Sequence, residues 1–313
     1  MRKYDRNAVF NIVIKVILFA LSFTGSFLLF TFPLKIRMLI SALLSVIIAL
    51  GVVFLFSILL RYTRFYYPYY SFVSKFIFRD KEGNVFCPCC SKYFDAFRDE
   101  RFYADPKRFN PDMFSNARQD VICDFCRSAP RHRIIAEWAE DNISLLQSSK
   151  ILYFAPELSM MLWFRKNRIR VKTADLYDPR TDLKLDITAL DLPDGSEDIV
   201  FCNHILEHVS DYSKALSELH RVIRKGGRLI ISFPIDPDTD IVREGNGCSV
   251  EERIRLFGQN DHLRVFGKNS GRLLEDAGFE VDVIDVNAMP ENIMPVTGPA
   301  DYDANVIFCC IRK

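Results

Sequence analysis

The sequence lacks an excess of charge of either sign, because 41 lysines and arginines are balanced by 40 aspartates and glutamates, for a formal net charge of +1. No global field draws such a chain to nucleic acid or acidic substrates, so no nucleic-acid partner is expected. No G-x-G-x-x-G follows any apolar run, which makes a nicotinamide-dependent oxidoreductase a poor interpretation. At 313 residues, 49% of them hydrophobic, the chain can form a sizeable core and more than one domain.

Long apolar runs, in contrast, dominate the first sixty residues. Residues 16–32 carry no charge, and residues 38–60 form a second uncharged run of 23 residues. At about 1.5 Å per helical residue, each run spans or nearly spans a hydrocarbon core of about 30 Å. We therefore predict a transmembrane helical hairpin over residues 1–65, with spans at about 10–32 and 38–60. A cleaved signal peptide and a buried hairpin in a soluble protein are the alternatives.

Basic residues predict the orientation of this hairpin. Those before the first run and after the second outnumber Lys35 and Arg37 in the connecting turn, which favours both chain ends in the cytoplasm. Residues 66–82 then mix aromatic and basic side chains, as an interfacial linker does. We expect an integral membrane protein that contacts the membrane through its hairpin, with its catalytic domain facing the cytoplasm.

Five of the nine cysteines lie in two clusters. Two C-x2-C knuckles, Cys87 with Cys90 and Cys123 with Cys126, have the spacing that a tetrahedral zinc ion requires. The long separation between the knuckles predicts a small zinc-ribbon-like lobe and helix over residues 83–145. Four thiolates would close the coordination sphere, so the zinc would be structural. A disulfide framework and a redox pair are the alternatives, and Cys89 is a substitute ligand.

A helix follows the second knuckle. Pro130 is a favourable first helical residue, and apolar residues recur behind it at helical spacing. Four basic residues gather at its start: Arg127, Arg131, His132 and Arg133. We expect them to form a solvated basic face, in preference to a site for an anionic substrate group.

From Lys150 onward, strand and helix patterns alternate, which predicts an α/β domain over residues 146–313. Strands are expected to start near residues 151, 171, 198, 228, 280 and 305, and helices to cover about 158–168, 211–224 and 269–277. Ligands bind such sheets at the carboxyl ends of the strands, so the residues just past each apolar run are the site candidates.

Acidic residues follow two of these strands. Asp175 lies 20 residues after Ala155, where a nucleoside-binding fold places a carboxylate that accepts hydrogen bonds from the ribose hydroxyls. Asp186 follows another short strand and is a candidate boundary of an adenine pocket. The next strand ends in Asn203 and His204, followed by Glu207 and His208.

One segment resembles a known family. The passage DITALDLPDGSEDIVFCNHILEHVSDYSKALSELHRVIRKGGRLIISFP is similar to the core of class I S-adenosylmethionine-dependent methyltransferases, particularly the group called type 11. A narrower resemblance is to a subgroup with an N-terminal cysteine-knuckle zinc lobe, RHR (residues 131–133), APE (155–157) and GQNDHLR (258–264). The resemblance implies S-adenosylmethionine as cofactor and a Rossmann-like seven-stranded sheet whose last strand, NVIFCCI, is antiparallel.

The turn after the first strand departs from the family. Most members have a glycine-rich loop there, commonly preceded by an acidic residue, whereas this chain has FAPEL, with Tyr153 at the acidic position. The resemblance implies that Ala155, Pro156 and Glu157 bind the methionine moiety, with Glu157 near its amino group; loss of cofactor binding is the alternative. It also implies that Asn203 and His204 lie at the mouth of the cofactor pocket.

Methyl transfer from a sulfonium is an in-line displacement that needs a base where the nucleophile carries a proton. Candidates for this base are His204, Asp261 and His262. The sequence thus predicts a membrane-anchored methyltransferase with an unidentified acceptor, which could be lipid-linked, a glycan, a protein or a small metabolite. The alternative is a non-catalytic, zinc-containing scaffold protein with a degenerate methyltransferase domain.

Overall fold

The computed structural model describes residues 82–98, 121–236, 238–284 and 306–313, together with residues 36, 43, 45–49, 51, 290 and 293. The chain divides into two compact units, Met1–Tyr66 and Tyr67–Lys313. Most of the predicted hairpin and of the interfacial linker lies outside the described residues. Within the described part, no helix combines the length and the hydropathy that a bilayer crossing needs.

The centre of the second unit is a seven-stranded sheet with the strand order β11-β12-β7-β6-β3-β4-β5. Its strands are β3 (Ile151–Phe154), β4 (Val171–Asp175), β5 (Leu183–Lys184), β6 (Glu197–Asn203), β7 (Ile223–Ser232), β11 (Phe279–Val283) and β12 (Phe308–Arg312). The pairs β3–β4, β3–β6, β4–β5 and β6–β7 are parallel, whereas β12 pairs antiparallel with both β7 and β11. The predicted seven-stranded, mostly parallel sheet with an antiparallel last strand is confirmed.

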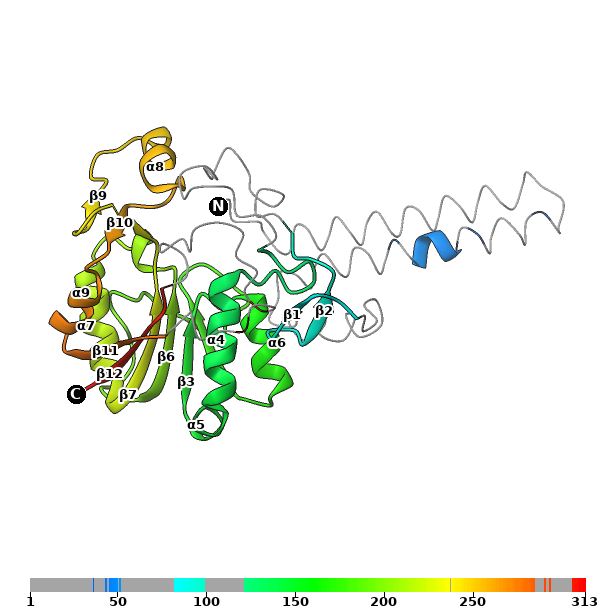
Figure 1. Cartoon of the computed structure of the whole chain (residues 1–313), viewed down its shortest axis with the longest axis horizontal. Helices are drawn as coiled ribbons and strands as arrows, with labels where there is room; N and C mark the ends of the chain where they lie inside the picture. The colour runs from blue at the N-terminus through cyan, green and yellow to red at the C-terminus, as the bar shows by residue number, and fades with distance from the viewer. Residues whose placement is uncertain are drawn as a thin grey trace. The chain divides into compact units, whose positions relative to one another are not determined.

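Both faces of the sheet are covered, which explains why its strands are continuous apolar runs. On one face, Tyr153 of β3 and Phe201 of β6 have ring centroids 5.5 Å apart, and Phe164 of α6 (Leu158–Lys166) lies 5.4 Å from Phe201. Trp138 of α4 (Pro130–Asp141) packs against the same ring of Phe201. Figure 1 shows α4 and α6 beside each other next to β3.

The opposite face of the sheet packs against α7 (Tyr212–Val222). This helix begins at Asp211, whose side chain accepts a hydrogen bond from the backbone N–H of Lys214, as an N-cap residue does. Its buried residues, Ala215, Leu216, Leu219 and Val222, follow helical spacing and join the core cluster of β3, β6 and β7. Two short helices complete the framework, α5 (Ile143–Ser148) and α9 (Gly271–Asp276).

A second, three-stranded sheet was not expected from the sequence. It contains β8 (Ile235–Asp236), β9 (Arg243–Glu244) and β10 (Arg264–Gly267) in the order β8-β10-β9, and α8 (Val250–Phe257) lies between its last two strands in the chain. Arg264 of β10 donates hydrogen bonds to the carbonyl groups of Leu206, Val209 and Ser210. This small sheet therefore fixes the loop that follows β6.

Candidate functional site

The loops after β3 and β6 meet where the order of the sheet reverses. The two strands are parallel neighbours, yet the chain continues from β3 to β4 on one side and from β6 to β7 on the other. Such a switch point opens a crevice at the carboxyl ends of the strands. The loops at these strand ends contain FAPEL and NHILEH, so the topology brings the two principal groups of site candidates to one edge of the sheet.

The first residue after β3 has a backbone conformation that glycine usually adopts. Ala155 has φ 46°, and its N–H donates to the carbonyl of Ala174 at 2.9 Å. His204, which follows β6, has φ 51° and donates from its N–H to the carbonyl of Ser232 at 2.8 Å. A side chain in this left-handed region costs about 1–2 kcal/mol. The turn after β3 therefore lacks the glycine that most family members have, but Ala155 adopts the left-handed backbone conformation that a glycine would adopt there.

Glu157 connects this turn to α4. Its Oε1 lies 2.9 Å from Arg131 Nη2 and 2.5 Å from His132 Nε2, and Tyr153 Oη donates to its Oε2 at 3.3 Å. Burial alone would raise the pKa of Glu157, but contact with His132 and Arg131 outweighs burial and holds this pKa well below its usual range. The carboxylate expected near the cofactor's amino group thus already has one cationic neighbour from the protein, Arg131.

The basic residues at the start of α4 differ from the expected solvated face. His132 and Arg133 are buried, and Arg133 donates hydrogen bonds to the carbonyl groups of Val121, Ser128 and Ile293. Its guanidinium also lies 4.2 Å from the ring centroid of Phe97. These groups hold the cysteine lobe together instead of facing solvent.

The two predicted aspartates lie at the same edge of the sheet, at or just after the ends of β4 and β5. Asp175 Oδ1 accepts hydrogen bonds from the N–H groups of Tyr177 and Asp178, at 2.6 and 2.7 Å. Asp186 Oδ1 accepts from the N–H and hydroxyl of Thr188, and these hydrogen bonds lower the pKa of Asp186. In both aspartates, Oδ1 accepts hydrogen bonds from the residues that follow and so stabilises the turn after the strand.

Unpartnered polar atoms mark the end of β6. Asn203 is buried, and its Oδ1 accepts a hydrogen bond from Ser232 Oγ at 3.0 Å. Among the residues described, neither Asn203 Nδ2 nor His204 Nε2 has a hydrogen-bond partner, although both atoms are buried. Buried polar atoms are nearly always paired, so two such atoms at a switch point indicate a place for a ligand.

Two of the three predicted base candidates, His204 and His262, lie close to the buried carboxylate of Glu207, and the third, Asp261, contacts the neighbouring His208. Glu207 lies in the 3₁₀ turn Leu206–His208, and its Oε1 is 3.2 Å from His204 Nδ1. The rings of His208 and His262 have centroids 4.8 Å apart, and His208 Nδ1 lies 3.2 Å from the carbonyl oxygen of Asp261. No role was predicted from the sequence for Glu207 or His208, although their H-x-x-E-H spacing with His204 was an available signal.

Burial sets the charge state of this group. It lowers the pKa of His204, with a further contribution from Arg131, and it also lowers the pKa of His262. Burial alone would raise the pKa of Glu207, but contact with His204 and the neighbouring histidines lowers it. At neutral pH, therefore, Glu207 is a carboxylate and His204 is an uncharged imidazole that can accept a proton.

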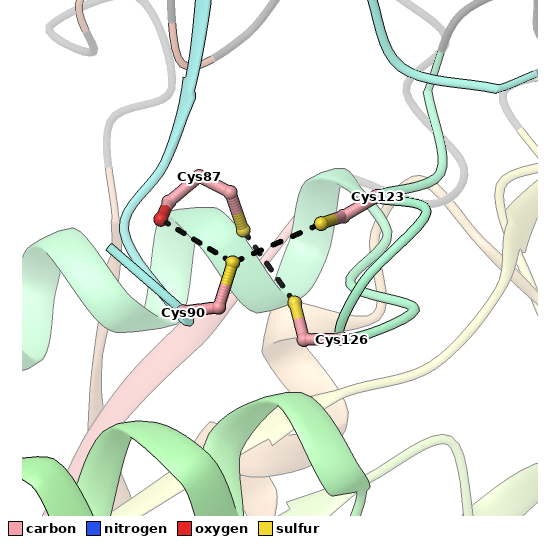
Figure 2. A group of neighbouring side chains, drawn as sticks. All are labelled: Cys87, Cys90, Cys123 and Cys126. Atoms are coloured by element: carbon pink, nitrogen blue, oxygen red, sulfur yellow. Dashed lines mark hydrogen bonds between the residues drawn. The ribbon is translucent and has the colours of Figure 1, made fainter. Parts of the chain in front are cut away.

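The four predicted zinc ligands converge (Figure 2). Cys87 ends β1 (Val85–Cys87), which pairs antiparallel with β2 (Lys92–Phe94). The four sulfur atoms lie within 4.8 Å of one another, with Cys87 and Cys126 at 3.5 Å and Cys90 and Cys123 at 3.9 Å. All nine cysteines are free thiols, so this cluster is not a disulfide framework.

The two knuckles have matching backbones. The N–H of Ser91 donates to the carbonyl of Cys87 at 2.7 Å, and that of Arg127 to Cys123 at 2.9 Å. Ser91 and Arg127 both have positive φ, at 55° and 62°. Burial alone would raise the pKa of Cys126, but hydrogen bonds from neighbouring thiols, first that of Cys123, lower it to about 5. Each knuckle thus presents two sulfur atoms in the same way.

Comparison with known proteins agrees with the fold. A family model described as a methyltransferase domain matches residues 160–231. An uncharacterized transposon-encoded protein of Streptomyces fradiae is 35% identical over 114 residues, covering 34% of this chain and 31% of that protein. A probable S-adenosylmethionine-dependent methyltransferase of Mycolicibacterium smegmatis is 31% identical over 115 residues, covering 33% of this chain and 37% of that protein.

Among solved structures, an S-adenosylmethionine-dependent methyltransferase from Mesorhizobium loti has 16% identity and a TM-score of 0.40, over 57% of this chain and 98% of that one. The chain spans only about a third of the length of the two curated relatives. The family match lies within the α/β domain, and the sheet has the strand number and the antiparallel last strand that the family resemblance implies. The α/β domain of this chain is therefore similar to methyltransferase domains over residues 160–231, and its sheet has the topology that the family resemblance implies.

Proposed function

We propose that this protein transfers a methyl group from S-adenosylmethionine to an acceptor bound where β3 and β6 end. The observation that carries the proposal is the pair of unpartnered, buried polar atoms at this edge, Asn203 Nδ2 and His204 Nε2. They lie in a domain of the methyltransferase family, and their position fits a cofactor that offers polar groups to a crevice.

The residues at this edge fit the cofactor's separate parts. Asp175 would accept hydrogen bonds from the ribose hydroxyls, and Asp186 would border the adenine. Ala155, Pro156 and Glu157 would face the methionine moiety, since the positive φ of Ala155 curls the backbone as a glycine would. When bound, the cofactor supplies a sulfonium whose methyl group is already electrophilic.

His204 is the base that we propose for an acceptor carrying a proton. Burial keeps its imidazole neutral at pH 7, because the pKa of His204 is lowered. Glu207 lies 3.2 Å from Nδ1 and would orient the ring. Nε2, buried and without a partner among the described residues, would then receive the proton. Asp261 and His262 border this group and remain candidates for the same role.

We also propose a structural zinc ion bound by Cys87, Cys90, Cys123 and Cys126. Four thiolates at about 2.3 Å from a tetrahedral zinc ion lie about 3.8 Å from one another. The sulfur separations of 3.5 and 3.9 Å support this geometry. Cys89 donates to the carbonyl of His132 at 3.4 Å instead, which argues against its use as a substitute ligand.

The uncharged runs at 16–32 and 38–60 support an anchor in the membrane, with the methyltransferase domain in the cytoplasm. Such an anchor favours an acceptor at or near the bilayer, whether lipid-linked, a glycan precursor, a protein or a small metabolite.

The acceptor and the activity can be tested together. Cells that make the wild-type protein or His204→Asn would be given methyl-labelled methionine, and the label in their lipids, polar metabolites and proteins would be compared. Label that appears in a product only with the wild type supports transfer. If the protein binds the cofactor but adds label to no lipid, metabolite or protein, methyl transfer is contradicted and the chain is a non-catalytic scaffold.

A further inference from the structure

Glu207 has no adequate partner for its charge. Its side chain is fully buried, and its Oε2 has no hydrogen-bond donor among the described residues. The nearest polar atom that the structure records is His204 Nδ1, 3.2 Å from Oε1, and no described lysine or arginine pairs with it. A buried carboxylate without donors or a cation is costly. Such a group indicates a place that suits a cation.

His262 presents an imidazole in the tautomer that binds metals. Its Nδ1 lies 2.6 Å from the carbonyl oxygen of Phe257. A carbonyl only accepts hydrogen bonds, so Nδ1 carries the proton and Nε2 keeps its lone pair. This Nε2 is buried and has no partner in the described part of the chain. A backbone carbonyl that fixes one nitrogen while the other binds a metal is the usual arrangement around ligating histidines.

His208 is arranged in the same way. Its Nδ1 lies 3.2 Å from the carbonyl oxygen of Asp261, which again assigns the proton to Nδ1 and leaves Nε2 as a lone-pair donor. Glu207, His208 and His262 each offer one ligand atom, and these atoms lie within 4.8 Å of one another. Two adjacent residues and a third that follows 54 positions after His208 thus meet at one point.

We propose that Glu207, His208 and His262 bind a divalent transition-metal cation, distinct from the zinc proposed at the four cysteines. Two imidazoles and one carboxylate suit Zn²⁺ and its first-row neighbours, and three protein ligands leave a coordination position open. The four-cysteine cluster would be closed by its own ligands, as a structural site is. The site at Glu207 has instead three protein ligands and one free coordination position, as catalytic metal sites do.

The surrounding hydrogen bonds hold these ligands in position. The N–H of Leu263 donates to the carbonyl of Glu207 at 2.8 Å, and Arg264 donates to the carbonyl of Leu206 within the 3₁₀ turn and to those of Val209 and Ser210 just after it. The loop with His262 is therefore tied directly to the turn with Glu207 and His208. Such outer contacts are what a preorganised metal site requires.

A role in the reaction follows, and it rests on the proposed methyl transfer. The ion's open position would bind an acceptor hydroxyl and lower its pKa, as bound metals do for water. The hydroxyl proton would pass to His204 Nε2, and the oxygen would attack the methyl carbon. The bond between this carbon and the sulfonium sulfur breaks, its electron pair stays on sulfur, and a neutral thioether leaves. The site thus favours an oxygen acceptor.

Metal content tests the site independently of the reaction. The full-length chain, in mild detergent, would be stripped with a chelator, reloaded with Zn²⁺, passed through gel filtration and analysed for elements. We expect two zinc ions per chain for the wild type and one for Glu207→Gln and for His262→Asn, whose amide can still donate to Phe257. The matched control is His220→Asn, a histidine on α7 outside the cluster, which should retain two.

Melting monitored by tryptophan fluorescence confirms that each variant is folded. One zinc ion in the wild type, or two in both His262→Asn and Glu207→Gln, would overturn the metal site. Cofactor binding, measured on the same samples, separates this proposal from the proposed function. A wild-type protein that binds S-adenosylmethionine but holds no second zinc ion contradicts the metal site alone. A wild-type protein that holds a second zinc ion but does not bind S-adenosylmethionine supports the metal site and contradicts methyl transfer.

Discussion

Glu157 Oε1 lies 2.5 Å from His132 Nε2, and this contact joins the helix of the cysteine lobe to the turn after the first strand of the large sheet. The N–H of Ala129 donates to His132 Nδ1 at 2.8 Å. Nδ1 therefore carries no proton, and the proton of the neutral ring is on Nε2, facing the carboxylate. The lobe and the candidate cofactor turn are thus coupled through one oriented imidazole.

This coupling predicts that Glu157→Gln lowers the free energy of unfolding by about 1.5–3 kcal/mol, the range for hydrogen bonds to a charged group. The pKa of Glu157 is held below its usual range in the folded protein. Its stabilisation is therefore present above the unfolded pKa of about 4.3 and is lost as the pH falls below that value. Urea unfolding, followed by the fluorescence of Trp138 and Trp163, measures both effects.

The control for this variant is Glu275→Gln, an exposed glutamate on α9. It should leave both the stability and its pH dependence unchanged. Equal stability of Glu157→Gln and the wild type, with the same acid dependence, would show that the ion pair contributes nothing.

The left-handed conformation of Ala155 predicts an unusual response to substitution. Ala155→Gly should leave the free energy of unfolding within about 1 kcal/mol of the wild type, because relief of strain offsets the entropy of the added glycine. Ala155→Val should destabilise the protein, because a branched side chain is strongly disfavoured at φ 46°. Thermal melts of the two variants compare them directly. A valine variant as stable as the glycine variant would contradict this backbone conformation.

The four-cysteine site predicts a loss of metal in Cys123→Ser. Elemental analysis of the full-length protein should find one zinc ion fewer per chain than in the wild type, together with a lower melting temperature, because bound metal contributes to folding. Cys89→Ser is the matched control, since this buried thiol lies next to the cluster but donates to His132. If both variants keep the wild-type zinc content, the proposed ligand set is wrong.

The hairpin predicts a cytoplasmic carboxyl terminus. A reporter fused after Lys313 should be active in a form that works only in the cytoplasm and silent in a form that requires export. The reverse pattern would contradict the orientation and would put the cysteines in an oxidising compartment, where thiol ligation of zinc is less favoured.

The large sheet could be predicted from the sequence because its strands are buried on both faces. Runs such as ILYF at 151 and DIVFCN at 198 must then be continuously apolar. The convergence of the two cysteine knuckles could also be predicted, since each C-x2-C pair has the short, fixed spacing that brings two thiols together. The three-stranded sheet could not, because β8 and β9 have two residues each and depend on long-range pairing with β10.

The centre of the candidate site could be predicted only in part from the sequence. Asn203 and His204 were found because they follow an apolar run directly. No functional role was predicted for Glu207, because its burial depends on the loop at 258–263. No local sequence pattern places this loop against the 3₁₀ turn. His132 and Arg133 were misread as a solvated face for the same reason, since their partners, Glu157 and the carbonyl groups of the cysteine lobe, lie elsewhere in the chain.

Cofactor binding at Asp175 tests the central claim most directly. Calorimetric titration of the full-length protein with S-adenosylmethionine should show binding, and Asp175→Ala should weaken it by about 1.5–3 kcal/mol, or roughly 10- to 150-fold in Kd. Asp175→Asn should fall between the two, because its amide keeps one acceptor but loses the charge. Asp276→Ala, an exposed aspartate on α9, should bind like the wild type. A folded wild-type protein that binds no cofactor at millimolar concentration would contradict the methyltransferase function and leave the non-catalytic scaffold.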